Sequence, residues 1–138
     1  MNIMAKITVE ATRENTPKAA AFVEAELEKI SCPFKELSQI NIAVDELFCN
    51  IASYAYLDSS GKAEITVQSN GPNEVSVTFE DWGIPYNPLQ KDDPDVTLSA
   101  EDRKIGGLGI FIVKKTMDNV QYKHEDGKNI LTITKKWQ

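Results

Sequence analysis

The feature that most constrains the fold is a pair of strand-like segments joined by a short turn. Apolar and polar residues alternate from Ala63 to Ser69 and again from Glu74 to Asp81. The connection, Asn70-Gly71-Pro72-Asn73, is made of residue types that reverse the chain. Because alternation places the apolar side chains of each strand on one face, the predicted hairpin needs a second layer to cover that face.

The segments before this hairpin favour one strand and two helices. Alternation from Ile7 to Thr12 predicts a strand with one buried face. Thr16-Pro17 supplies an N-cap and a first-turn proline for a helix that closes at Cys32-Pro33. A longer apolar stripe predicts a second helix from about Phe34 to Tyr56.

The segments after the hairpin contain one more helix and two more strands. An aperiodic stretch runs from Trp82 to Ile105, and a glycine-led helix should follow it to about Met117. Strands near Val120 to His124 and Ile130 to Lys135 surround a turn at Glu125-Asp126-Gly127-Lys128.

The aperiodic stretch is polar and is interrupted by Pro85, Pro88 and Pro94. So long a segment without a regular element inside a compact domain is typical of a lid or a binding loop. We therefore expect the residues from about Tyr86 to Ile105 to form a lid over a ligand site.

The order of these elements, β-α-α-β-β-loop-α-β-β, predicts an α/β (α+β) two-layer sandwich. We expect helices on one face of a mostly antiparallel, mixed sheet. The chain has 138 residues and no linker-like segment, so residues 1–138 are expected to form a single domain.

Composition argues against several classes of function. A net charge of −6 disfavours a nucleic-acid surface, which needs a basic face. A membrane is disfavoured too, because no apolar run approaches the roughly 18 residues of a spanning helix and no signal-peptide core is present. Cys32, Cys49 and His124 form no metal-binding pattern, so we interpret both cysteines as reduced thiols in a cytoplasmic protein.

A glycine cluster leads into the third predicted helix. Gly106-Gly107-Leu108-Gly109 follows Arg103-Lys104, and glycines allow a ligand to approach the backbone closely. The first turn of a helix also leaves unpaired N–H groups that suit phosphate. A Rossmann fingerprint is excluded because Ile112 stands where its third glycine belongs, and the chain has no Walker A spacing. The alternative is a loop whose glycines serve helix packing only.

Asp81 continues the alternating apolar row of its strand, so its carboxylate should point toward the buried face. A buried carboxylate is costly unless another group donates a hydrogen bond to it. Gly83 follows closely and would let a flat ligand lie against the backbone. The alternative is a carboxylate that only caps the following turn.

Glu46 and Asn50 stand four residues apart on the long predicted helix, so they share one face. A carboxylate can act as a general base on a hydroxyl, and an amide oxygen is a hard ligand suited to Mg²⁺. Most such pairs are solvated helix surface, and that alternative stays open from the spacing alone.

These sites together resemble the N, G1 and G2 boxes of the GHKL ATPase and kinase superfamily. The three matching segments are, in order, Asp45-Glu46-Leu47-Phe48-Cys49-Asn50, Asp81-Trp82-Gly83-Ile84-Pro85 and Gly106-Gly107-Leu108-Gly109. Within the superfamily the chain is most similar to the anti-sigma-factor serine kinases of the bacterial switch type. The resemblance extends from about Ile7 to Lys136.

The resemblance implies a Bergerat-type ATP-binding fold and a role for each matching residue. Asp81 would accept a hydrogen bond from the adenine amino group, and Gly83 would make room for the base. Asn50 would hold Mg²⁺, and Glu46 would be the catalytic base that activates the attacking hydroxyl. Thr132 is the candidate for a threonine that supports the adenine site in this family.

The resemblance also assigns residues to the phosphate end of the nucleotide. The phosphates of ATP would lie against Gly106-Gly107-Leu108-Gly109, with Arg103 and Lys104 as partners of the γ-phosphate. Pro85 departs from the family, because a second glycine is common at that position.

The implied function is that of an ATP-dependent serine/threonine-protein kinase. Its substrate would be an anti-sigma-factor antagonist of the STAS type, and its second partner a sigma factor. Members of this family often form homodimers. One alternative is a non-catalytic switch that uses ATP only to shape a partner surface, although Glu46 favours catalysis. The catalytic domain of a sensor histidine kinase is a weaker alternative, because no dimerisation helix with a phosphoacceptor histidine is evident.

Overall fold

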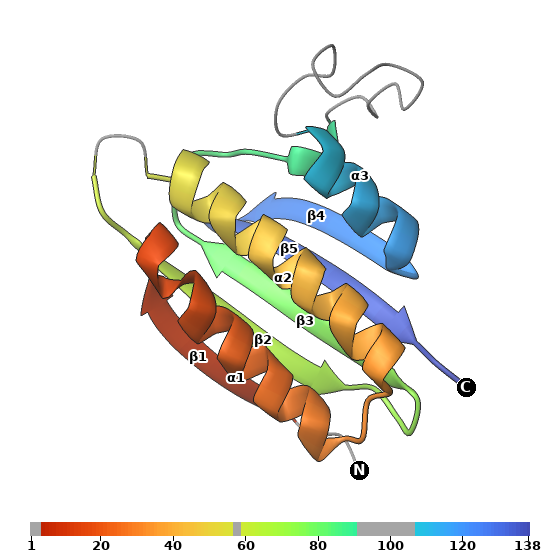
Figure 1. The fold of residues 1–138 in the computed structure, drawn as a ribbon. Coiled ribbons are helices and arrows are strands. Elements are labelled where there is room, and N and C mark those ends of the chain that lie inside the picture. Colours follow the sequence, from red (N-terminus) through yellow and green to blue (C-terminus); the bar gives the residue numbers. More distant parts are fainter. Residues whose placement is uncertain (1–3, 57–58, 91–106) are drawn as a thin grey trace.

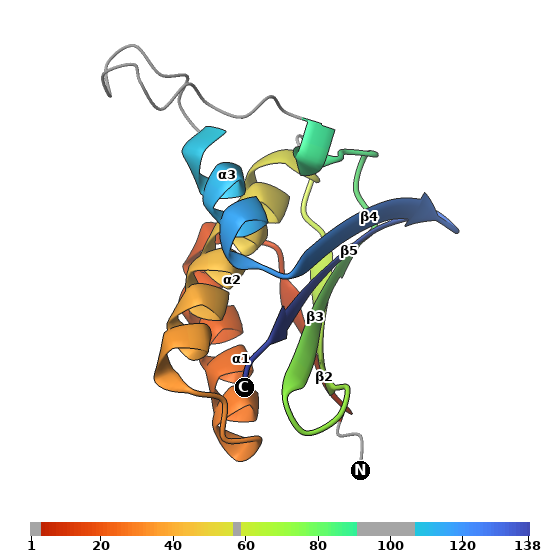
Figure 2. The ribbon, with the colours of Figure 1, turned by 90° about the vertical axis from the view of Figure 1, so that its right-hand side faces the viewer.

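The computed structural model describes residues 4–56, 59–90 and 107–138. A five-stranded sheet is covered on one face by helices (Figure 1), and the second view shows these two layers edge-on (Figure 2). The strands are β1 (Met4–Glu10), β2 (Lys62–Ser69), β3 (Glu74–Asp81), β4 (Asn119–Glu125) and β5 (Lys128–Lys136). The helices are α1 (Thr16–Lys29), α2 (Phe34–Tyr54) and α3 (Gly107–Thr116), with short 3-10 turns at Arg13–Asn15 and Pro88–Gln90.

The two-layer α+β sandwich is confirmed, but the prediction of a mixed sheet is wrong. The strand order is β1-β2-β3-β5-β4, and every pairing is antiparallel. After α3 the chain forms the hairpin of β4 and β5, and its second strand takes the place beside β3. Because β5 lies between β3 and β4 and runs antiparallel to both, no parallel pair arises among the described strands.

Both predicted hairpins are confirmed. In the first, Ala63 lies opposite Asp81 and Ser69 opposite Val75. In the second, the two turn residues Asp126 and Gly127 have φ of 54° and 77°. Positive φ at both central positions is typical of the two-residue turns that match strand twist.

The core forms where the apolar rows of the strands meet α1 and α2. The row predicted on β3 is buried, with Val75 and Val77 1% exposed and Phe79 2% exposed. Its largest fully buried partners come from the helices and the neighbouring strands: Val23, Leu27, Ile40, Val44, Phe48, Ile65, Ile110, Val113 and Ile133. The alternation that predicted the hairpin therefore also selects the face that packs.

The start of the first helix differs from its prediction. Thr16 is the first residue of α1, and the N-cap position belongs to Asn15, whose side chain donates to the Glu10 carbonyl oxygen instead of capping. The Thr16 hydroxyl contacts the Cys49 thiol at 3.7 Å. The predicted N-cap role of Thr16 is therefore wrong, because α2 packs close enough to engage its hydroxyl.

The opposite face of the sheet carries polar side chains. The hydroxyls of Thr78 and Thr132 are 3.1 Å apart, and those of Ser76 and Thr134 are 3.2 Å apart. Hydroxyl pairs of this kind join neighbouring strands on a face that none of the described helices covers (Figure 2). No helix within the described ranges is long and apolar enough to cross a membrane.

Candidate functional site

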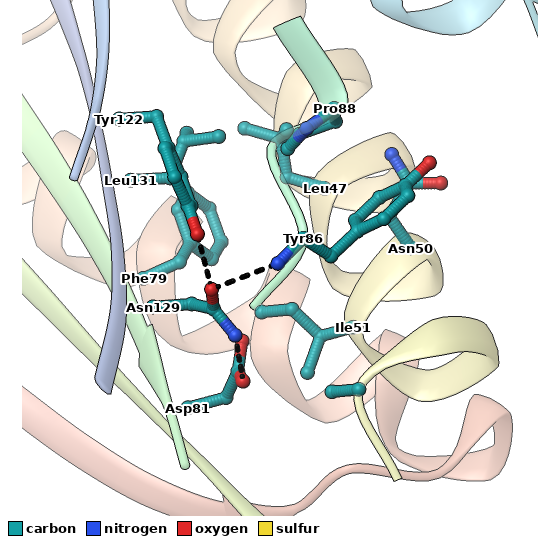
Figure 3. Close-up of a pocket in the computed structure, with 11 residues that line it drawn as sticks. Leu47, Asn50, Ile51, Phe79, Asp81, Tyr86, Pro88, Tyr122, Asn129 and Leu131 are labelled. Carbon is teal, nitrogen blue, oxygen red and sulfur yellow. Dashed lines mark hydrogen bonds between the residues drawn. The ribbon is translucent and has the colours of Figure 1, made fainter. Parts of the chain in front are cut away.

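A pocket lies between α2 and the sheet, beneath the segment that follows β3 (Figure 3). Its volume is about 40 Å³, which is room for a few water molecules. The walls are mostly apolar, with a small number of polar groups at the two ends. The lining residues are Leu47, Asn50, Ile51, Ala55, Phe79, Asp81, Tyr86, Pro88, Tyr122, Asn129 and Leu131.

Asp81 ends β3 inside this pocket, as its place in the alternating row predicted. It is 4% exposed, and its Oδ1 accepts hydrogen bonds from the Gly83 N–H and the Asn129 side-chain amide, each at 2.9 Å. Burial raises the pKa of the Asp81 carboxyl, while these two hydrogen bonds and the His124 side chain lower it. The burial effect is the largest, so the pKa lies above the ordinary value.

Asn129 is a site residue that the sequence did not reveal. It lies opposite Asp81 on β5 and is 6% exposed. Its side chain forms hydrogen bonds both with the Asp81 carboxylate and with the segment after β3, and so links the two (Figure 3). One signal could have found it, since Asn129 shares its parity along the strand with the buried residues Leu131 and Ile133.

Thr132, the candidate from the family resemblance, does not line the pocket. It alternates with Leu131 and Ile133, so its hydroxyl points to the uncovered face and pairs with Thr78. The prediction that Thr132 supports the site is wrong for this reason.

Gly83 is required by the approach of α2 to the segment after β3. A Cβ atom at Gly83 would lie 2.2 Å from the carbonyl oxygen of Ala55 and 2.6 Å from its carbonyl carbon. The next residue, Ile84, donates its N–H to the same oxygen at 3.0 Å. The glycine therefore holds this segment against the end of α2, whatever room it leaves for a ligand.

Glu46 and the glycine cluster lie together, although 60 or so residues separate them in the sequence. A Cβ atom added to Gly109 would lie 1.5 Å from Oε1 of Glu46 and 2.2 Å from its Cδ. The carboxylate on α2 therefore occupies the space that a side chain on the first turn of α3 would need. Two of the predicted sites thus form one structural unit.

Asn50 lies one helical turn beyond Glu46 and lines the pocket near Tyr86 (Figure 3). Its Nδ2 is buried and has no hydrogen-bond partner among the described residues. An unsatisfied buried amide is costly, so it marks a place where a polar ligand would be stabilised.

Part of the glycine cluster can be placed. Gly107 begins α3, and Leu108 is 40% exposed at its first turn. Arg103, Lys104 and Gly106 lie outside the described residues, as does most of the predicted lid. Where the lid segment is described, Pro88–Gln90 forms a 3-10 turn. No cluster of three or more histidine, cysteine or acidic side chains suited to a metal occurs in the described ranges.

Comparison with known proteins gives the family of this chain. Residues 9–135 match the model of the histidine kinase-like ATPase domain. The chain is 30% identical over 95 residues to the serine/threonine-protein kinase BtrW of Bordetella bronchiseptica, which covers 69% of this chain and 67% of that protein. It is 28% identical over 126 residues to an anti-sigma F factor of Clostridium perfringens, with 91% and 90% covered.

A third relative and a solved structure agree with these matches. The serine-protein kinase RsbW of Bacillus thuringiensis is 26% identical over 102 residues, or 71% of this chain and 63% of that protein. The crystal structure of the RsbU and RsbW domains of Rv1364c from Mycobacterium tuberculosis superposes with a TM-score of 0.69 at 17% identity. That match covers 97% of this chain and 32% of the longer one, and it supports the fold alone. The chain belongs to the histidine kinase-like ATPase family, within its group of anti-sigma factors and serine/threonine-protein kinases.

Proposed function

We propose that this chain is an ATP-binding anti-sigma regulatory factor with serine/threonine-protein kinase activity. Its substrate would be a hydroxyl of an anti-sigma-factor antagonist of the STAS type, and its second partner would be a sigma factor. The names of its relatives, an anti-sigma F factor and two protein kinases, support this assignment. Residues 1–138 would act as one cytoplasmic domain.

The observation that carries the proposal is the contact between Glu46 and Gly109. The first N–H groups of a helix have no intrahelical partner and attract phosphate, so the first turn of α3 suits the terminal phosphates of ATP. A carboxylate beside a polyphosphate opposes binding by like-charge repulsion. Its presence is explained if it accepts the proton of the hydroxyl that attacks the γ-phosphate.

At the other end of the pocket, Asp81 suits an adenine base. An ionised carboxylate is an acceptor only, so it can receive a hydrogen bond from the exocyclic amino group. The apolar walls from Leu47, Ile51, Phe79 and Leu131 would contact the faces of the ring. The nucleoside would then extend along the pocket from Asp81 to Asn50.

The donor groups of Asn50 fit a bound Mg²⁺ and its phosphates. Its amide oxygen can ligate the cation, and the buried Nδ2 that lacks a partner can donate to a phosphate oxygen. When bound, Mg²⁺ would offset the charge of the phosphates that face Glu46.

The segment after β3 contributes to the lining of the pocket. Tyr86 and Pro88 form the wall that faces the sheet (Figure 3). The ring of Tyr86 stacks on Tyr54 with centroids 5.2 Å apart. Tyr86 is also the residue at which the predicted lid begins.

Phosphotransfer to candidate antagonist proteins from the host, assayed with labelled ATP, tests the proposal. Wild-type protein should produce phosphoserine or phosphothreonine. Glu46→Gln should lower the rate by about 10²–10⁴-fold while leaving ATP affinity nearly intact, because the shape of the site is kept. The matched control is Asp45→Asn, which makes the same change at an exposed neighbour.

Two results would change the assignment. Wild-type rates from Glu46→Gln would exclude Glu46 as the base. A verified partner that binds without being phosphorylated, in a protein that still binds ATP, would favour the non-catalytic switch.

A further inference from the structure

The side chain of Asn129 lies at the centre of a network of four hydrogen bonds, three of which are drawn in Figure 3. Its Nδ2 donates to Oδ1 of Asp81 at 2.9 Å and to the carbonyl oxygen of Ile84 at 2.8 Å. Its Oδ1 accepts from the Tyr86 N–H at 3.1 Å and from the Tyr122 hydroxyl. One side chain thus joins β3, β4 and the segment that forms the outer wall of the pocket.

The four bonds fix the orientation of the amide. A primary amide has two N–H donors and one carbonyl oxygen that accepts two hydrogen bonds, so this group is saturated. If the amide were rotated by 180°, its oxygen would face the Asp81 carboxylate and its N–H groups would face the Tyr86 N–H. Both contacts would be repulsive, so a donor always faces Asp81.

This donor determines which part of the carboxylate remains available. The bonds from Asn129 and Gly83 both reach Oδ1, and within the described part of the chain no hydrogen bond reaches Oδ2. A saturated amide has no donor or acceptor left for a hydrogen bond to a base. Its polar influence on a ligand therefore passes through Asp81.

We propose that Asn129 is a positioning residue that keeps Asp81 oriented and ionised, and so makes the pocket select a base with an amino group over one with a carbonyl oxygen. This inference rests on the proposed function, because it requires a nucleotide base beside Asp81. An ionised carboxylate accepts from an amino group and repels a carbonyl oxygen. A protonated carboxyl can instead donate to the carbonyl, so the preference depends on the charge that Asn129 supports.

Other titratable groups face Asp81 from the elements around it. Tyr56 lies beyond the end of α2, and Tyr122 and His124 come from β4. Burial also raises the pKa of Tyr56 and of Tyr122, so neither hydroxyl ionises near neutral pH. His124 lowers the pKa of Asp81 and so opposes the effect of burial. For this reason each Asn129 variant is compared with wild type at every pH.

The test measures binding of ATP and of inosine triphosphate by calorimetry from pH 6 to pH 8. The two nucleotides differ at the six position of the purine, which carries an amino group in one and a carbonyl oxygen in the other. Asn129→Leu removes the donor at similar volume, and its ATP affinity at pH 7 should fall roughly 10-fold relative to wild type. The loss should grow as pH falls, because loss of the Asn129 hydrogen bond raises the pKa of Asp81 further and its carboxyl takes up a proton more readily. The preference for ATP should shrink with it.

Asn129→Asp should show the opposite dependence on pH. At pH 6 a proton shared by the two carboxyls replaces the lost amide donor, so ATP affinity stays closer to wild type. Toward pH 8 both carboxyls ionise and repel each other, so affinity falls. This variant also covers the case in which Asn129→Leu does not fold, because at pH 6 it retains a donor. Thr132→Val, on the same strand but the opposite face, should leave both affinities unchanged.

The outcomes separate the two proposals. Failure of wild-type protein to bind either nucleotide would overturn the proposed function, and this inference with it. Wild-type binding together with equal losses for both nucleotides at every pH would show that Asn129 only supports the fold. Opposite pH dependence in the two variants, with a changed preference between the nucleotides, would support the positioning role.

Discussion

The two ends of the pocket are built in opposite ways. At the end that holds Asp81, strands supply the polar groups, and the side chain of Asn129 makes every hydrogen bond it can form. At the end that holds Asn50, a helix supplies them, and a buried amide nitrogen lacks a partner among the described residues.

The difference indicates which end is complete before a ligand binds. A satisfied buried network holds one arrangement, whereas an unsatisfied polar group gains most from a new partner. We therefore interpret the sheet end as preformed for the base and the helix end as completed by phosphates and cation. Glycines mark both ends, but Gly83 faces backbone and Gly109 faces the tip of a side chain.

The largest expected effect is on catalysis at the helix end. Gly109→Ala places a Cβ where Oε1 of Glu46 lies, so the carboxylate must move while the backbone of α3 can stay. Displacing a reacting group by about 1 Å can cost roughly 10²-fold in rate, and we expect a loss of that size in phosphotransfer. Melting temperature should not fall, since alanine favours a helix over glycine.

A double variant checks that this loss passes through Glu46. If Gly109→Ala acts by displacing the carboxylate, adding it to Glu46→Gln should cause little further loss. Independent, multiplying losses would contradict the mechanism.

A smaller effect, on stability, is expected at the sheet end. Gly83→Ala places a Cβ 2.2 Å from the Ala55 carbonyl oxygen, and backbone on both sides must shift. We expect the free energy of unfolding, measured by denaturant without nucleotide, to fall by about 1–3 kcal/mol. Gly127→Asn is the control, because no atom lies within 4 Å of its added Cβ and asparagine tolerates its positive φ. Equal stability of Gly83→Ala and wild type would show that the two segments are not held together as described.

The smallest effect concerns the charge of Asp81 in the unliganded protein. Burial raises the pKa of this carboxyl above its ordinary value of 3.8, so the folded state holds its proton more tightly than the unfolded state. The contribution to stability is fully present below pH 3.8 and is lost as pH rises through the raised pKa. Asp81→Asn lacks this titration, so its melting temperature relative to wild type should increase between pH 4 and pH 8. A difference that is constant or decreases with pH would contradict the assignment.

Much of this arrangement follows from local periodicity. Alternation predicted that Asp81 points to the buried face, and helical spacing placed Glu46 and Asn50 on one face of α2. These predictions succeed because side-chain direction within one element depends on that element alone.

What could not be predicted depends on contacts between elements. Asn129 meets Asp81 only because β5, and not β4, lies beside β3 in a particular register. The clash that makes Gly109 necessary depends on how α2 packs against α3. Neither strand order nor helix packing has a signature in a single sequence, and the Thr16 hydroxyl was misassigned for the same reason.

Binding of adenosine and of Mg-ATP to Asp81→Asn and Asn50→Ala, measured by titration calorimetry, separates the two ends of the pocket. Asp81→Asn should weaken both ligands by the same factor, about 10- to 150-fold, because both carry the base. Asn50→Ala should weaken Mg-ATP and leave adenosine unchanged, since only the triphosphate reaches the helix end. Equal losses of adenosine and Mg-ATP in Asn50→Ala, or unchanged binding of both in Asp81→Asn, would contradict the division of the site into a base end and a phosphate end.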